Sequence, residues 1–345
     1  MSDLVRAALA TVIEGRSLSV DEARGAMGSV MDGEATAAQL AALLVALRMR
    51  GETVDELAGF ATAMRDRVLP VEAPVGTIDV VGTGGDGAGT FNISTAAALV
   101  VAAAGVPVAK HGNRAITSRS GSADVLEALG VRVDHDQASA ARDLRDLGFA
   151  FLFAPAFHPA MRHAGPTRRE IGVRTAFNLL GPLTNPAGAR RAVVGVGDAA
   201  AAPRIAAVAG ILGTERTLVV RGLGVDELPL DGSGFIHAVT PGGIEVTPVD
   251  AAELGLEAAP TAALGGGSAV ENAAIVERIF GGEAGPRRDV VLLNAAAGFL
   301  AAGRSASLGE GIDLARSTLD AGRAAALLAR LRDANRADCA DGPAR

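Results

Sequence analysis

The spacing of apolar residues changes character near residue 70. Before that point apolar residues recur at helical spacing, as Leu40 and Leu44 do. Three segments there begin with a capping box, in which Ser or Thr is followed three residues later by Glu or Gln: Ser19 to Glu22, Thr36 to Gln39 and Thr53 to Glu56. Pro70 and Pro74 then interrupt the chain. The first part of the chain is therefore predicted to be helical and to end in a linker.

Beyond this linker, short β-rich runs alternate with helical ones. The predicted strands are Thr77–Val81, Val106–Ala109, Val131–Val133, Phe149–Phe153, Ala192–Gly197 and Thr217–Val220. The predicted helices between them are Ile93–Ala104, Ser122–Leu129, Ala138–Leu147 and Pro203–Leu212. This alternation predicts an α/β fold with a mostly parallel sheet and crossover helices.

Two later strands are predicted to form a hairpin at the sheet edge. They are Phe235–Val239 and Ile244–Thr247, joined around Pro241-Gly242-Gly243. Pro248 has no N–H to donate to the ladder, so it is predicted to end the second strand. Helices are expected again from about residue 267 to 335.

One amphipathic run, Arg168–Leu180, lies between proline-bearing turns and contains no predicted strand. It is expected to leave the sheet and to join the first helices. The resulting prediction is a small all-helical domain of residues 1–72 with about 166–190, and a large α/β domain of residues 73–165 with 191–345.

Composition narrows the classes of function. Hydrophobic residues make up 49% of the 345, so a large core is possible, and the net charge is −7 with 3% aromatic residues. A nucleic-acid binder would need a basic balance and stacking side chains, so that class is disfavoured. There is one cysteine, Cys339, no start resembling a signal peptide and no apolar run long enough for a membrane span. A cytoplasmic protein is expected.

Lys110 is the only lysine, whereas the other 31 basic residues are arginines. A lone lysine in this background indicates a position where a compact ammonium works and a planar guanidinium does not.

A glycine-rich turn, Gly82-Thr83-Gly84-Gly85-Asp86-Gly87, follows the first predicted strand. Glycines let backbone N–H groups approach a phosphate with no side chain in the way. The turn also fits the dinucleotide pattern G-x-G-x-x-G, but that pattern needs an acid about 20 residues on. Because the next strand here leads into Lys110-His111, the turn predicts a phosphate site and disfavours NAD.

Two neighbouring segments supply further groups for phosphate. Asn92-Ile93-Ser94-Thr95 begins a helix, and its oxygens and amides either cap that helix or hold phosphate and Mg²⁺, with Ser94 as a hydroxyl ligand. The loop from Lys110 to Ser122 carries three cations and several hydroxyls. Since ligands of open α/β sheets bind at the carboxyl ends of the strands, both segments are expected beside the glycine turn.

Other candidate residues leave alternatives open. Asp226 and Glu227 are either two surface acids or Mg²⁺ ligands. Arg168 or Arg169 either clamps a substrate carboxylate or lies on a helix surface with an i,i+4 pair of Glu170 and Arg174. Four histidines show no metal-ligand spacing and are predicted to be structural or on the surface: His135, His158, His163 and His237.

Taken together, these motifs resemble the anthranilate phosphoribosyltransferase family over nearly the whole chain. The quoted segments include Lys110-His111-Gly112-Asn113-Arg114, His158-Pro159-Ala160-Met161-Arg162, Arg174–Pro186 and Asp226-Glu227, besides the glycine turn and Phe91–Thr95. The resemblance implies transfer of the phosphoribosyl group of 5-phosphoribosyl 1-diphosphate (PRPP) to anthranilate, the second step of tryptophan biosynthesis from anthranilate.

The resemblance also implies roles for individual residues. PRPP is expected to contact Gly82, Gly85, Asp86, Thr90, Asn92, Ile93, Ser94, Thr95, Lys110, Ser118 and Ser122. Anthranilate is expected at Gly82, Asn113 and Arg168, and metal at Ser94, Asp226 and Glu227. Lys110 would stabilise the leaving diphosphate. No general base is expected, because an aromatic amine is already neutral at pH 7.

The family further implies two Mg²⁺ ions per monomer and a homodimer formed through the helical domain, which also lies on the anthranilate side. Association with separate anthranilate synthase subunits stays open. The alternative is a pyrimidine nucleoside phosphorylase-like glycosyltransferase of the same architecture. Such an enzyme would share the Lys-His loop but would not need Asp226-Glu227 or the run Phe177–Pro186.

Overall fold

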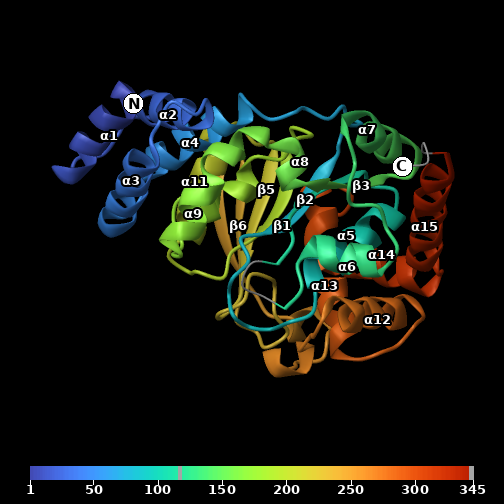
Figure 1. Ribbon diagram of the computed structural model, residues 1–345. Coiled ribbons are helices and arrows are strands. Elements are labelled where there is room, and N and C mark those ends of the chain that lie inside the picture. The colour runs from blue at the N-terminus through green and yellow to red at the C-terminus, as the bar shows by residue number, and fades with distance from the viewer. Residues whose placement is uncertain (116–118, 342–345) are drawn as a thin grey trace.

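The computed structural model describes residues 1–115 and 119–341, with side chains described as far as Arg336. Its first four helices lie together at one end of the molecule (Figure 1): α1 (Asp3–Ile13), α2 (Val20–Met31), α3 (Ala37–Arg50) and α4 (Val54–Arg65). The three predicted capping boxes are confirmed, since Ser19, Thr36 and Thr53 each accept a hydrogen bond from the N–H three residues on. These helix starts are therefore determined locally.

A seven-stranded sheet forms the centre of the rest of the chain, in the order β3-β2-β1-β4-β5-β6-β7. Its strands are β1 (Ile78–Gly82), β2 (Val108–Gly112), β3 (Phe149–Phe153), β4 (Arg191–Gly195), β5 (Arg216–Arg221), β6 (Gly234–Thr240) and β7 (Gly243–Val249). The first five strands pair in parallel, and β6 and β7 pair antiparallel. The predicted mostly parallel sheet with an edge hairpin is confirmed.

The remaining helices connect the strands or follow them. They are α5 (Ile93–Ala103), α6 (Ser122–Ala128), α7 (Gln137–Asp146), α8 (Ala154–Phe157), α9 (Gly165–Ile171), α10 (Phe177–Leu180), α11 (Ala202–Ile211), α12 (Ala269–Phe280), α13 (Pro286–Ala302), α14 (Leu308–Asp320) and α15 (Arg323–Asp341). Short 3₁₀ turns occupy Pro159–His163, Gly181–Leu183, Ala252–Leu254 and Thr261–Leu264. Within the described residues, no helix is long and apolar enough to cross a membrane.

The two faces of the sheet pack against different helices, because alternate residues of a strand point to opposite sides. Val193 of β4 belongs to a core shared with α5, α6 and α12–α15. Its neighbour Val194 belongs to a second core, which continues through α11 and α10 into α1–α4. Figure 1 shows α13–α15 on the side of the molecule away from the first helices. The helical end is thus joined to the sheet by a continuous apolar core.

Two strand predictions were wrong. Val131–Val133 forms no strand, although Val131 and Val133 are buried, because this segment packs its side chains into the core without a neighbouring strand to pair with. Pro248 does not end β7, which continues to Val249 with Pro248 opposite Phe235. Since β7 is the last strand of the sheet, an edge position tolerates the missing N–H.

The run Arg168–Leu180 is not one helix. Gly172, at φ 68°, ends α9, and a short connector leads to α10. A glycine in this left-handed conformation commonly ends a helix. Ala176, Phe177 and Leu180 then pack into the core that joins the first four helices to one face of the sheet.

Candidate active site

The glycine turn lies between the end of β1 and the start of α5. Gly84, Gly85, Gly87 and Gly89 have φ between 62° and 77°, a conformation that other L-residues rarely adopt. Gly82 has a different requirement, because a Cβ there would lie 2.4 Å from Oδ2 of Asp226. The glycines therefore shape the turn and let an acid from a distant loop come close to it.

Three carboxylates meet at this turn. One oxygen each of Asp86, Asp226 and Glu227 lie within 4.8 Å of one another. The N–H of Gly84 donates to Asp226 Oδ2 at 2.8 Å, and the N–H of Asp226 donates to Asp86 Oδ2 at 3.3 Å. Asp226 and Glu227 come from the loop after β5, so about 140 residues separate them from Asp86 in the sequence. The structure adds Asp86 to the acid pair that the sequence singled out.

The carboxylates of this acid cluster repel one another, and burial makes their charged forms less favourable still. Burial raises the pKa of Glu227 well above its ordinary value, and the charges of Asp226 and Asp86 raise it further. Burial and Asp86 likewise raise the pKa of Asp226. Oε2 of Glu227 is buried and has no hydrogen-bond partner among the described residues. Hard oxygen donors of this kind fit a divalent cation, which would neutralise the repulsion.

Lys110 lies beside these acids. Its side chain is 2% exposed, and its Nζ donates to the carbonyl of Val80 on the neighbouring strand. Burial lowers the pKa of Lys110 to about 8, and the charges of Asp79, Glu227 and Asp226 oppose that fall. Lys110 Nζ thus lies against β1, the strand that leads into the glycine turn contacted by Asp226.

The start of α5 presents unused hydrogen-bond donors. Asn92 does not cap the helix with its side chain. It instead donates to the carbonyl of Ser120 at 3.2 Å and accepts from Asn272 at 2.9 Å. Among the described residues, the N–H groups of Ser94 and Thr95 have no partner, and neither has the buried hydroxyl of Thr95. Ile93 is buried beneath them. These free groups suit an anion.

The loop after β2 is only partly available to a ligand. Ser122 donates to the carbonyl of Asn113 at 3.3 Å. Arg114 forms ion pairs with Asp124 and Glu127 and lies over the ring of Phe153. Arg114 is therefore engaged in ion pairs on the protein surface. Ser118 lies outside the described residues. Thr90, another expected contact, forms an isolated bridge with Gly265.

Two buried histidines lie close to each other: His158, which was expected to be structural or on the surface, and His111 of β2. The rings of His111 and His158 are 5.1 Å apart. His111 Nδ1 lies 3.1 Å from the carbonyl of Gly181, which can only accept, so Nδ1 carries the proton and Nε2 offers a lone pair. Nε2 of both rings is buried without a described partner. Burial lowers the pKa of His111 to about 3 and that of His158 to about 4, so both are neutral at pH 7.

The arginines of the α9–α10 segment have separate surroundings. Arg168 is half-buried over the ring of Phe177, 4.7 Å from its centre, while Arg169 is exposed. Arg174 does not pair with Glu170 as the helical reading allowed, because α9 ends before it. Its Nη1 instead donates to the carbonyls of Gly84 at 3.0 Å and Gly85 at 2.9 Å.

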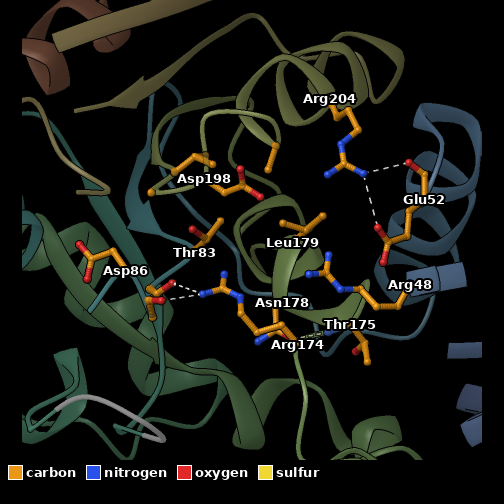
Figure 2. A pocket seen from close by; sticks show the side chains of 15 residues that line it. Arg48, Glu52, Thr83, Asp86, Arg174, Thr175, Asn178, Leu179, Asp198 and Arg204 are labelled. Carbon is orange, nitrogen blue, oxygen red and sulfur yellow. Dashed lines mark hydrogen bonds and ion pairs between the residues drawn. The ribbon is translucent and has the colours of Figure 1, made fainter. Parts of the chain in front are cut away.

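A cavity of about 260 Å³ lies behind the glycine turn, between the sheet and the first helices (Figure 2). Its walls include the ends of β1 and β4, where the strand order reverses, the usual position for ligands in open α/β sheets. Across it, Arg204 donates to the carbonyl of Glu52 at 3.1 Å, and Arg48 lines the same wall. These lining residues lie on α3, the α10 region and α11, so only folding brings them together.

Comparison with known proteins places this architecture in a class. A model of the glycosyl transferase family, a/b domain, matches residues 75–325, and one of the same family's helical bundle domain matches residues 6–68. The chain thus belongs to the glycosyl transferase family that joins a helical bundle to an α/β domain.

Individual relatives narrow this class. Anthranilate phosphoribosyltransferase of Thermomicrobium roseum is 51% identical over 335 residues, covering 95% of this chain and 96% of the relative. The enzyme of that name from Moorella thermoacetica is 52% identical, covering 94% and 96%. The crystal structure of the Thermus thermophilus enzyme has a TM-score of 0.90 at 49% identity, covering 95% of this chain and 99% of that one. This chain belongs to the anthranilate phosphoribosyltransferase family.

A more distant relative has a solved structure that is described as a complex with ligands. It is the anthranilate phosphoribosyltransferase of Saccharomyces cerevisiae in complex with PRPP and Mg. At 26% identity it has a TM-score of 0.89 and covers 98% of this chain and 99% of its own. The same fold is therefore retained at much lower sequence identity.

Proposed function

We propose that this chain transfers the 5-phosphoribosyl group of PRPP to the amine of anthranilate, giving N-(5-phosphoribosyl)anthranilate and diphosphate. The observation that carries the proposal is the meeting of three carboxylates, one buried lysine and unpartnered amides at one edge of the sheet. Relatives that are about half identical bear the name of this activity, which is the second step of tryptophan biosynthesis from anthranilate.

The acid cluster fits magnesium, the ion in the yeast complex. Asp226 and Glu227, with Asp86, are the residues that would hold it, and Ser94 would serve a second ion of the two that we propose per monomer. When bound, Mg²⁺ offsets negative charge on the departing diphosphate. The unpartnered Oε2 of Glu227 and the raised pKa of this carboxyl support the assignment.

The PRPP site combines fixed donors with the lysine. As the bond between ribose and diphosphate breaks, negative charge gathers on the leaving group. The ammonium of Lys110 and the amides at the start of α5 stabilise that charge without having to reorganise. A pKa of about 8 leaves Lys110 mainly protonated at pH 7. The PRPP contacts proposed from the sequence are Gly82, Gly85, Asp86, Thr90, Asn92, Ile93, Ser94, Thr95, Lys110, Ser118 and Ser122.

Anthranilate is proposed to bind between Gly82, Asn113 and Arg168, with the guanidinium of Arg168 on its carboxylate. Burial lowers the pKa of Arg168, yet a guanidinium stays protonated at pH 7. The neutral rings of His111 and His158 supply lone pairs that suit the amine protons. Holding the amine in line with the ribose carbon is the main contribution expected of these residues, since the amine is already neutral.

The phosphorylase alternative is not favoured. Phosphorolysis of a nucleoside takes inorganic phosphate and does not require a cluster of three acids for a metal-bound diphosphate. Asp86 adds a third carboxylate to the acid pair, which strengthens the case for a metal-bound diphosphate.

We also propose a homodimer formed through the first helices. Apolar side chains are exposed there, Leu4 and Ile13 on α1 and Val45 and Met49 on α3. A second copy of the chain would cover this surface. The small domain of residues 1–72 with 166–190 would then serve both dimerisation and the anthranilate side, and the enzyme would be cytoplasmic.

The test follows anthranilate by its own fluorescence in the presence of PRPP and Mg²⁺. Consumption is expected only when all three components and the protein are present, and omission of any one should stop it. Activity on a pyrimidine nucleoside with phosphate, independent of Mg²⁺, would instead establish the alternative. Size-exclusion chromatography with light scattering tests the dimer separately.

A further inference from the structure

Arg174 donates hydrogen bonds to the backbone of the glycine turn, and the proposed reaction gives this residue no role. It lies on the connector between α9 and α10, and its neighbours Ala176 and Phe177 are buried in the core of the first four helices. From this anchor its Nη1 donates to two successive carbonyls, those of Gly84 and Gly85 (Figure 2). Among the described residues, these two carbonyls have no other donor.

Because Arg174 holds these two carbonyls, it also orients the N–H groups of the same two peptide bonds. The two peptides concerned are trans, and the C=O and N–H of a trans peptide point in opposite directions. With both carbonyls turned toward Arg174, the N–H groups of Gly85 and Asp86 face the other side of the turn. Neither N–H has a partner among the described residues. Two successive free amides on one side of a glycine turn form an anion-binding surface.

The turn needs such a contact, because its own backbone is permissive. Gly84 and Gly85 both have positive φ, and glycine loses more conformational freedom on folding than any other residue. The acid cluster holds the opposite side, where Gly84 N–H donates to Asp226 and the carboxylate of Asp86 accepts from the N–H of Ala88 at 3.1 Å. No described contact on that side fixes the two carbonyls.

We infer that Arg174 is a positioning residue, which holds the glycine turn so that the amides of Gly85 and Asp86 face the phosphate groups of PRPP. This inference rests on the proposed function. The guanidinium donates to two carbonyls at once, which a single ammonium does less well. The phosphate could be the diphosphate or the 5-phosphate of PRPP, and the ligands used in the test distinguish these two.

The test compares three variants with the wild type: Arg174→Ala, Arg174→Lys and Arg190→Ala. Arg190 is an exposed arginine just before β4, and its guanidinium donates to the carbonyl of Gly213, away from the glycine turn. Steady-state kinetics give KM for PRPP and anthranilate, calorimetry gives affinities for PRPP, Mg-diphosphate and ribose 5-phosphate, and thermal unfolding checks the fold.

The expected result is a rise of roughly tenfold in KM and Kd for PRPP in Arg174→Ala, the size of one hydrogen-bonded contact to a charged group. KM for anthranilate and the midpoint of unfolding should stay close to wild type, Arg174→Lys should lie between, and Arg190→Ala should leave the affinity for PRPP unchanged. Loss of affinity for Mg-diphosphate alone assigns the amides to the leaving group, and loss for ribose 5-phosphate alone assigns them to the 5-phosphate.

Two results would overturn the inference. One is unchanged PRPP affinity in Arg174→Ala, and the other is an equal loss in Arg190→Ala, which would mean that the contact of Arg174 with the glycine turn has no special role. If Arg174→Ala unfolds, the PRPP affinity of Arg174→Lys decides, with wild-type affinity counting against the inference. A wild-type protein that binds no PRPP would refute the proposed function itself. The inference about Arg174 is tested separately, by comparing the PRPP affinity of each variant with that of a wild type that does bind PRPP.

Discussion

Two buried glutamates, Glu56 among the first helices and Glu227 at the carboxyl ends of the strands, have very different surroundings. Glu56 of α4 is 0% exposed and fully engaged: the N–H groups of Leu18 and Thr53 each donate to it at 2.9 Å, and Arg50 forms an ion pair with it. Glu227 is 9% exposed and lies among like charges, with one oxygen unpartnered among the described residues. Glu56 is stabilised by partners within the protein, whereas the charge of Glu227 requires a ligand such as a cation to offset it.

The same difference extends to the residues around each glutamate. Among the described residues, the unpartnered buried atoms Thr95 Oγ1, His111 Nε2 and His158 Nε2 belong to segments at the carboxyl ends of β1 to β3, although others, such as Ser305 Oγ, lie elsewhere. Proteins rarely leave buried polar groups without partners, so a concentration of them marks a place that a ligand completes. Burial alone therefore does not identify a functional carboxylate here, but burial without compensation does.

The largest effect is expected for Glu227→Gln. Removal of this charge should reduce kcat/KM by roughly a hundredfold or more, because the residues left would hold Mg²⁺ poorly. Unfolding in urea should show equal or greater stability, since like-charge repulsion in the cluster falls. Wild-type kinetics together with an unchanged Mg²⁺ requirement would contradict the metal-binding assignment of Glu227.

Lys110→Met is expected to come next. The variant keeps the length of the side chain and removes its charge, so KM for PRPP should rise by roughly 10- to 100-fold while KM for anthranilate changes much less. Initial rates with each substrate varied in turn measure both constants. Equal losses for the two substrates would argue against a role for Lys110 on the leaving diphosphate.

Glu56→Gln should lower stability and leave activity unchanged, the reverse of what is expected for Glu227→Gln. It leaves the partly buried Arg50 without its ion pair and weakens two backbone contacts, so the free energy of unfolding should fall by about 2 kcal/mol. Urea titration measures this loss, and kcat/KM per folded molecule should match wild type. Glu22→Gln is the control, an exposed capping glutamate whose replacement should cost less. A fall in kcat/KM without a fall in stability would remove the contrast between the two regions.

The effect that is smallest at pH 7 concerns acid stability. His158 has a pKa of about 4 in the fold and about 6.5 when unfolded, so the unfolded chain binds more protons between these values. Stability should therefore fall as pH drops below about 6.5, and His158→Gln should lessen the fall by up to about 3 kcal/mol between pH 7 and 4. Urea titrations at several pH values measure it, with the exposed His163→Gln as control. The same acid sensitivity in both variants would show that His158 does not contribute.

Much of the fold could be predicted because the signals are local. Capping boxes at Ser19, Thr36 and Thr53 need only four residues each, and alternating β runs and helices indicate crossover connections. Prediction failed where a tertiary contact decided. Val131–Val133 has strand composition but no neighbouring strand to pair with, and Pro248 lies on an edge that tolerates it.

For the candidate site, the residue types and their segments were predictable, but the partners were not. The sequence marked Lys110, the glycine turn and the pair Asp226-Glu227 by composition and spacing, yet Asp86 was not recognised as a third member of the acid cluster. Arg174 was read as a helix-surface residue, because the end of α9 at Gly172 was not recognised.

The sequence by itself determined most of the segments that become helix or strand and which side chains can bind phosphate and a divalent cation, because these properties depend on neighbouring residues and on side-chain chemistry. Only the tertiary structure decided which charges are compensated. That outcome depends on contacts between segments far apart in the chain, such as Asp226 with Gly84 and Arg174 with the opposite side of the same turn. Electrostatic cost follows distance in space and burial, and a linear pattern of residues contains neither.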